Sequence, residues 1–130
     1  MNNRTSVIEK KGFEYAFKIV HCYNYLADAK KENYFSSRLL KSGNAILHSI
    51  EDAQSAKSKP DYYTSLSASG NEARKTRTYL NLLKAAHVLE TEAADELLKE
   101  TDTYCKALSL LLSSSGIRKS ADFTKNTITE

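Results

Sequence analysis

Residues that could do chemistry are concentrated in one stretch, Ser42 to Gln54, which reads SGNAILHSIEDAQ. His48 and Asp52 are four residues apart and so share one face of a helix, with Glu51 beside them. They could supply part of a metal site, but the sequence contains no His-Glu-x-x-His motif, no Glu-x-x-His pair and no zinc-type Cys and His spacing. We therefore predict no metal and no cofactor, interpret the stretch as a packing surface, and expect His48 to face solvent or a neighbouring subunit.

Nucleophilic catalysis has no better support. Serines are abundant, but no Gly-x-Ser-x-Gly turn and no glycine-rich phosphate loop occurs. Cys22 and Cys105 are far apart and fall on apolar helix faces, so we expect small buried hydrophobic residues rather than a disulfide or metal ligands. His21 and His87 are isolated in the sequence. The chain is therefore predicted not to be an enzyme, and no catalytic residue is assigned.

The candidate site with a physical reason is a row of side chains at helical spacing. The row consists of Arg74, Arg77, Asn81 and Lys84, and it is flanked by Lys75. Cations on one helix face could contact successive phosphates of RNA or DNA. The sequence has no aromatic RNA-binding motif and no recognition-helix signature, so any binding would read the backbone rather than the bases. We predict nucleic-acid binding through Arg74, Lys75, Arg77 and Lys84.

The same row has a second interpretation, which is charge neutralisation within the fold. Residues 57–86 carry six Lys or Arg against two acids, and residues 87–115 carry six acids against two Lys. Helices formed from these two segments would attract each other. The bases would then pair with acids of the following helix, among them Glu92, Asp95, Glu96 and Glu100. The net charge of +3 is too small to decide between the two interpretations.

The elements that position these residues are predicted to be helices. The chain has 130 residues, enough for one domain, with one Pro and four Gly. Apolar residues at helical spacing predict helices over about residues 6–30, 34–56, 59–86 and 91–115, followed by a flexible tail over 116–130. Short polar turns between them indicate an all-α, antiparallel, up-down-up-down four-helix bundle. No signal segment and no apolar run of roughly 20 residues occurs, so we expect a soluble, cytoplasmic protein without a membrane partner.

The first predicted helix has an unusually broad apolar surface. One row contains Phe13, Ala16, Phe17 and Val20, and a second contains Tyr15, Ile19, Cys22 and Leu26. A surface helix of a small monomer usually needs a single stripe about 100° wide. The extra row therefore predicts packing against another copy of the chain.

Three segments resemble the bacterial family of 23S ribosomal RNA intervening-sequence proteins. They are LLKSGNAILHSIEDAQ, SKPDYYTSLSASGNEARKTRTYLNLL and ELLKETDTYCKALSLLL, within a similarity that covers roughly residues 10–115. The sequence departs from the family pattern at His48, Ser49, Lys75, Arg77 and Tyr79. The positions that match the pattern are Ser42, Gly43, Ile46, Ile50, Ala53, Ser58, Lys59, Asp61, Leu66, Glu72, Ala73, Thr76, Leu80, Leu82 and Leu83.

The resemblance implies an antiparallel bundle that assembles as a homopentameric ring. It also implies a possible nucleic-acid partner, because a related accessory protein of diversity-generating retroelements is expected to bind nucleic acid through a basic ring surface. Two functions therefore remain open for this chain. One is an oligomeric protein that binds RNA or DNA through the residue 59–86 helix, and the other is a structural scaffold for a protein partner.

Overall fold

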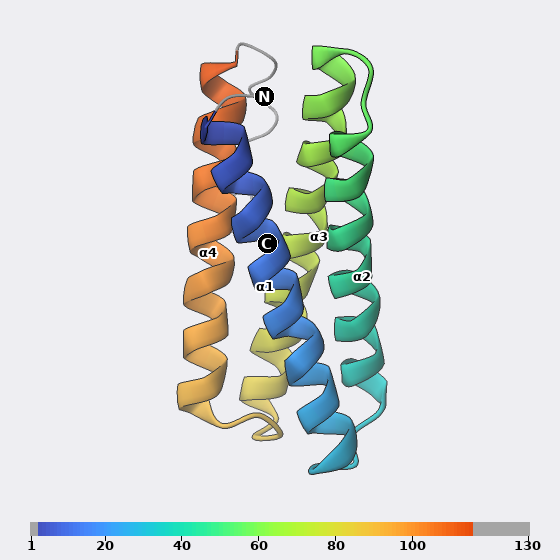
Figure 1. Cartoon of the computed structure of the whole chain (residues 1–130). Helices are drawn as coiled ribbons and strands as arrows, with labels where there is room; N and C mark the ends of the chain where they lie inside the picture. Colours follow the sequence, from blue (N-terminus) through green and yellow to red (C-terminus); the bar gives the residue numbers. More distant parts are fainter. Residues whose placement is uncertain (1–2, 116–130) are drawn as a thin grey trace.

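The computed structural model describes residues 3–115, which form four helices, and contains no strand in that range. Figure 1 shows them as α1 (Asn3–Asp28), α2 (Tyr34–Gln54), α3 (Lys59–Ala85) and α4 (Thr91–Ser114). The all-α four-helix prediction is confirmed. The helix starting at Asn3 begins three residues before the expected start, and α1 and α2 each end two residues before the expected end. The predicted tail over residues 116–130 lies outside the described residues.

Local chemistry explains where the helices begin and end. The Ser58 hydroxyl accepts a hydrogen bond from the Asp61 amide at 3.2 Å, and Pro60 occupies the first turn of α3. A capping serine followed by proline and an acid is a sequence pattern typical of a helix start. At the start of α2, the Glu32 carboxylate accepts from the amides of Phe35 and Ser36 at 3.0 and 2.9 Å. Lys31 has a positive φ of 55°, so the chain cannot continue α1 beyond this turn.

The helices pack in chain order around one core. Each helix contacts the next, and α1 also contacts α4, so the α2/α3 pair lies across the bundle from the α1/α4 pair. Figure 1 shows short turns that join consecutive helices at alternating ends of the bundle. None of the helices in residues 3–115 combines the length and apolar character that crossing a bilayer requires.

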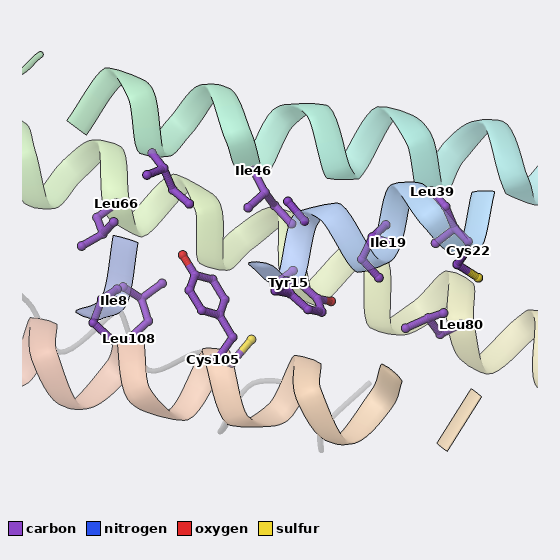
Figure 2. Close-up of a cluster of buried hydrophobic side chains, with 14 of the residues drawn as sticks. Ile8, Tyr15, Ile19, Cys22, Leu39, Ile46, Leu66, Leu80, Cys105 and Leu108 are labelled. Atoms are coloured by element: carbon purple, nitrogen blue, oxygen red, sulfur yellow. The ribbon is translucent and has the colours of Figure 1, made fainter. Parts of the chain in front are cut away.

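The stretch from Ser42 to Gln54 is a packing surface, as predicted. Ile46, Ile50 and Ala53 are buried in the core that Figure 2 shows between the helices. Gly43 is buried against α1, where an added Cβ would lie 3.0 Å from a methyl of Val20. The absence of a side chain at this position lets α1 and α2 approach closely, which offsets the low helix propensity of glycine.

Two buried tyrosines place polar atoms in the middle of this core. Tyr15 and Tyr104 stack with ring centroids 5.8 Å apart, and both side chains are almost fully buried. The hydroxyl of Thr101 donates to a backbone carbonyl, so the Tyr15 hydroxyl donates to Thr101 at 2.5 Å. The hydroxyl of Ser69 is likewise occupied as a donor, so Tyr104 donates to it at 2.7 Å. These contacts join α1 to α4 and α4 to α3.

Gly12 lies at the point where these contacts converge. It is buried in α1, and an added Cβ would lie 2.3 Å from the Ile50 side chain of α2 and 2.9 Å from the Tyr104 hydroxyl of α4. Even alanine would therefore displace one of these groups. The absence of a side chain at Gly12 makes room for the tyrosine that reaches α3.

The polar contact that fixes the helix register differs from the one that the sequence predicts. The spacing of Glu72 and Thr76, one turn apart, predicts a register-fixing polar contact with α2 or a neighbouring subunit, because a buried carboxylate needs hydrogen-bond partners. Thr76 is fully buried, but its hydroxyl donates to the backbone carbonyl of Glu72 within the same helix. The Glu72 carboxylate instead lies 3.3 Å from Lys75 near the surface. The hydroxyls of Thr101 and Ser69, which accept hydrogen bonds from Tyr15 and Tyr104, take the place of the expected carboxylate contact.

Removing the α3/α4 hydrogen bond gives a test of this polar core. We expect Tyr104→Phe and Ser69→Ala each to lower the free energy of unfolding by about 1 kcal/mol. The double variant should lose clearly less than the two separate losses together, because one hydrogen bond is counted in both. Urea denaturation measures all three values. Additive losses would show that the two hydroxyls do not interact.

The same tyrosine predicts an alkaline limit to stability. Burial raises the pKa of Tyr104 from 10.0 to about 12, and burial also raises the pKa of Tyr15. Above pH 10 the unfolded chain loses these protons while the folded chain keeps them, so the free energy of unfolding falls as the pH rises. We expect unfolding measured in urea at pH 8, 10 and 11 to show this fall, and Tyr104→Phe to reduce its slope. An identical slope in the variant would contradict the assignment.

Candidate functional site

The cations of α3 that the sequence predicts as a site do not form one open surface. Arg77 and Lys84 face α4, where they pair with Asp102 at 2.8 Å and with Asp95 at 2.5 Å. Lys75 does not join them, because it turns to Glu72 on its own helix. Arg74 is half-buried, and its Nε atom is enclosed without a hydrogen-bond partner in the described residues. The structure therefore brings together Arg77 and Lys84 but not the full predicted site.

Arg77 is the most deeply placed cation of this row. Its side chain is only 12% exposed, and its Nε and one terminal nitrogen are buried without partners among residues 3–115. The remaining terminal nitrogen reaches Asp102, whose side chain is 62% exposed. An arginine held in this way is poorly placed to contact a phosphate in solution. The α3/α4 ion pairs correspond to the second interpretation of the row, in which charge supports the fold.

Three other residues considered in the sequence analysis are His48, Cys22 and Cys105. His48 is 79% exposed and lies 3.8 Å from Glu51, and no cluster of three or more His, Cys, Asp or Glu within residues 3–115 could hold a metal ion. Cys22 and Cys105 are free and buried, as predicted, and burial raises the pKa of each thiol to about 11. Both thiols are therefore protonated at neutral pH, which makes them weak nucleophiles.

The feature with the clearest geometry is a groove between α1 and α4. It has a volume of about 600 Å³, and its lining is mostly apolar. Cys22 and Leu97 line the groove, while Phe17 and Tyr25 of α1 are 62% and 39% exposed along it. Of the two apolar rows of α1, the row with Tyr15 and Ile19 is buried in the bundle. Phe17, from the other row, is left facing solvent.

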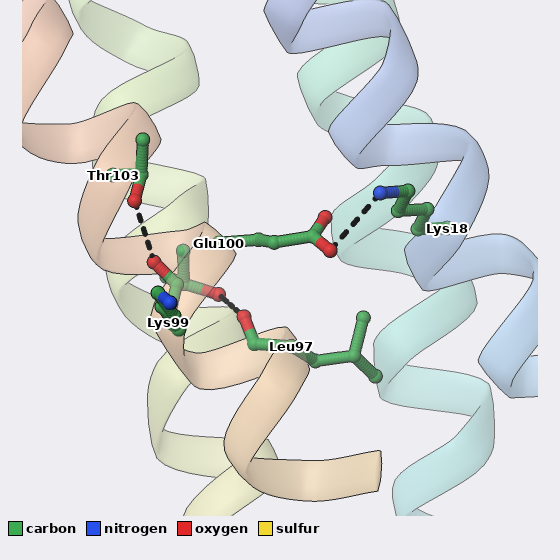
Figure 3. Close-up of polar contacts among 6 residues, drawn as sticks. Lys18, Leu97, Lys99, Glu100 and Thr103 are labelled. Carbon is green, nitrogen blue, oxygen red and sulfur yellow. Dashed lines mark hydrogen bonds and ion pairs between the residues drawn. The ribbon is translucent and has the colours of Figure 1, made fainter.

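Charged side chains border the groove on both helices. Lys18 of α1 reaches Glu100 of α4 at 3.0 Å, as Figure 3 shows, and this partner raises the pKa of Lys18. At the other end Lys30 lies 3.0 Å from Glu90 and lowers the pKa of that carboxyl. Glu96 also lines the groove and has no ion-pair partner in the described residues. The groove is thus apolar inside and slightly acidic at its edge.

Sequence reasoning found only half of this groove. The wide apolar surface of α1 was visible because its rows repeat at helical spacing. The sequence does not show that α4 forms the other side of the groove, because the spacing of residues along one helix does not indicate which face a distant helix packs against. The sequence does contain a signal for the α4 side of the groove. Ala93 is small and Glu96 and Glu100 are charged, so these residues of α4 leave Phe17 without a full apolar cover.

The fold and the groove define the class of protein as a four-helix bundle with an exposed apolar face. Residues 4–110 match the family model of the 23S rRNA-intervening sequence protein, and the chain belongs to this family. A crystal structure of a protein of unknown function from the S23 ribosomal protein family of Bacteroides thetaiotaomicron is similar, with a TM-score of 0.79 and 27% identity. The similarity covers 85% of this chain and 98% of that one. No curated protein matches the sequence.

Charge-reversal variants of α3 distinguish cations that stabilise the fold from cations that are free to bind a ligand. We expect Arg77→Glu to lower the free energy of unfolding by about 2 kcal/mol or more, because it buries a carboxylate beside Asp102. Lys84→Glu should cost less than about 1 kcal/mol, because that pair is largely solvated. Thermal or urea denaturation gives both values. Equal, small losses would mean that Arg77 is free to serve a ligand.

Proposed function

We propose that this protein is a non-enzymatic, self-assembling scaffold whose antiparallel, up-down-up-down bundles associate through the α1/α4 groove. The observation that carries the proposal is Phe17, which is 62% exposed and lines an apolar groove next to the buried face of α1. Water contact with this area is unfavourable, and another copy of the chain would remove it. The family resemblance implies five copies in a closed ring, and we adopt that number.

A ring requires two different surfaces on each subunit, because a heterologous contact repeats head to tail until it closes. The outer side of α4 offers the second surface. Leu110 is 64% exposed there, next to Leu98 and Ala107, in a shallow depression flanked by Lys99 and Lys106. Its two acids, Asp95 and Asp102, already pair with α3. Lys99 and Lys106 are opposite in charge to Glu96, which lies at the edge of the groove on the neighbouring subunit.

Binding of RNA or DNA through Arg74, Lys75, Arg77 and Lys84 remains the second candidate function. The supporting observation is that Lys75 is 62% exposed and Lys84 is 37% exposed, so a polyanion could compete for them. Its weakness is that Arg77, Lys75 and Lys84 all have carboxylate partners. A ring would repeat any such contact in each subunit and so increase the overall affinity.

A pair of complementary variants tests the two-surface assembly. We expect Phe17→Glu, which disables only the groove, and Leu110→Glu, which disables only the α4 surface, each to be monomeric by light scattering. A mixture of the two should form dimers and nothing larger, since one intact groove meets one intact α4 surface. Phe17→Leu serves as the matched control and should keep the mass of the unaltered protein.

Circular dichroism shows whether each variant keeps its helices, which is expected because both side chains are largely exposed. Two results would overturn the proposal. The unaltered protein could be a stable monomer at micromolar concentration, or the single variants could keep its assembled mass. A mixture that stays monomeric would reject Leu110 as the partner surface.

A further inference from the structure

A second exposed cluster lies on the opposite side of the bundle, at the start of α2. Tyr34 is 61% exposed, and the guanidinium of Arg38 lies over its ring, 4.7 Å from the centroid. Arg38 also donates to the Tyr34 hydroxyl at 3.0 Å. This hydrogen bond and the nearby Tyr79 of α3 raise the pKa of Arg38. An aromatic ring and a flat cation are thus held together on an exposed helix face.

The surroundings of this cluster are basic. Lys41 lies two turns beyond Tyr34 on the same face of α2, is exposed, and pairs with no carboxylate in the described residues. Lys31, in the turn before α2, is also exposed and has no such partner. Glu32, the acid that follows Lys31 in the sequence, accepts hydrogen bonds from the first amides of α2. None of Lys31, Arg38 and Lys41 forms an ion pair within the described part of the chain.

We propose that Tyr34, Arg38 and Lys41 form a binding site for single-stranded nucleic acid, in which an unpaired base stacks on the Tyr34 and Arg38 pair and Lys41 contacts a neighbouring phosphate. Proteins that bind single strands combine these two elements, an aromatic side chain for the base and cations for the backbone. Helical geometry places Lys41 about 10 Å along the axis from Tyr34, so base and phosphate contacts are separated along the strand.

The chemistry of the cluster favours this ligand over the alternatives. A base inside a duplex is already stacked on its neighbours, so a tyrosine on a helix surface can reach only unpaired bases. A protein partner would need more apolar area than this face provides, where Leu82, 43% exposed, is the only large aliphatic side chain of the described residues that is exposed on α2 or α3. The larger apolar surface is the α1/α4 groove, across the bundle.

The site is independent of the proposed assembly but compatible with it. The α2/α3 pair lies opposite α1/α4 in the order of helix contacts, so filling the groove with another copy leaves Tyr34 and Arg38 open. It is also distinct from the predicted α3 row, because Arg77 and Lys84 turn toward α4. A multimer would present one such site per subunit to a single strand.

Fluorescence anisotropy with labelled 15-nucleotide probes of uridine and of thymidine tests the site on the full chain. We expect both probes to bind at low salt, with Tyr34→Ala weakening binding about tenfold through loss of one stacked base. Lys41→Ala should reduce the slope of log affinity against log salt by about 0.7, the value for one phosphate contact on a single strand.

The matched control for charge is Lys10→Ala, which removes one exposed cation from α1 and should change the affinity less than twofold. A probe with abasic sugars in place of nucleosides should bind weakly, and equally to the unaltered protein and to Tyr34→Ala. The proposal is overturned if Tyr34→Ala binds uridine as the unaltered protein does, if Lys10→Ala loses as much as Lys41→Ala, or if neither probe binds. Masses of these variants, measured alongside, report separately on assembly.

Discussion

The hydroxyls of Tyr15 and Tyr104 impose the constraint on which the rest of this bundle depends. A hydroxyl in a hydrocarbon core costs several times the net value of a hydrogen bond unless it finds an acceptor. Each tyrosine reaches a short hydroxyl, on Thr101 or on Ser69, that a backbone carbonyl already holds in place. Leucine side chains tolerate sliding by part of a turn, whereas these contacts do not. They fix the register of α1 and α3 against α4, and through it the surfaces that each helix leaves outside.

The fold was predictable because it follows from patterns local to each helix. Apolar spacing defined four helices, and Ser58 with Pro60 and Asp61 marked the start of one of them. The expected helix ends were late at α1 and α2, since propensity alone does not show where a turn such as that at Lys31 takes over. The polar register contact was assigned to Glu72 because a carboxylate on an inward helix face needs partners. The chain instead uses two tyrosines. The sequence does not show which tyrosines place their hydroxyls inside the core, because their rings follow the same helical spacing as the other core residues.

The surfaces were less predictable than the core for a physical reason. Helical spacing shows that Arg77 and Lys84 share a face with Arg74, but it does not show that this face meets the acids of α4. Whether a cation of α3 is available to a ligand depends on whether an acid of α4 packs against it. Tyr34 and Arg38 show the opposite case. Their spacing of four residues is common in helices, and only the exposure of the Tyr34 ring and its contact with the Arg38 guanidinium distinguish them.

The missing side chain at Gly12 has a consequence for how such sequences can diverge. Its position touches Ile50 of α2 and Tyr104 of α4, and Tyr104 in turn holds Ser69 of α3, so all four helices share one small volume. An alanine there would be tolerated only with a smaller residue at 50 or a different aromatic at 104, and the second change would leave the serine hydroxyl without its donor. Relatives should therefore vary at these four sites together, so that a substitution in any one helix limits which substitutions the other three can accept.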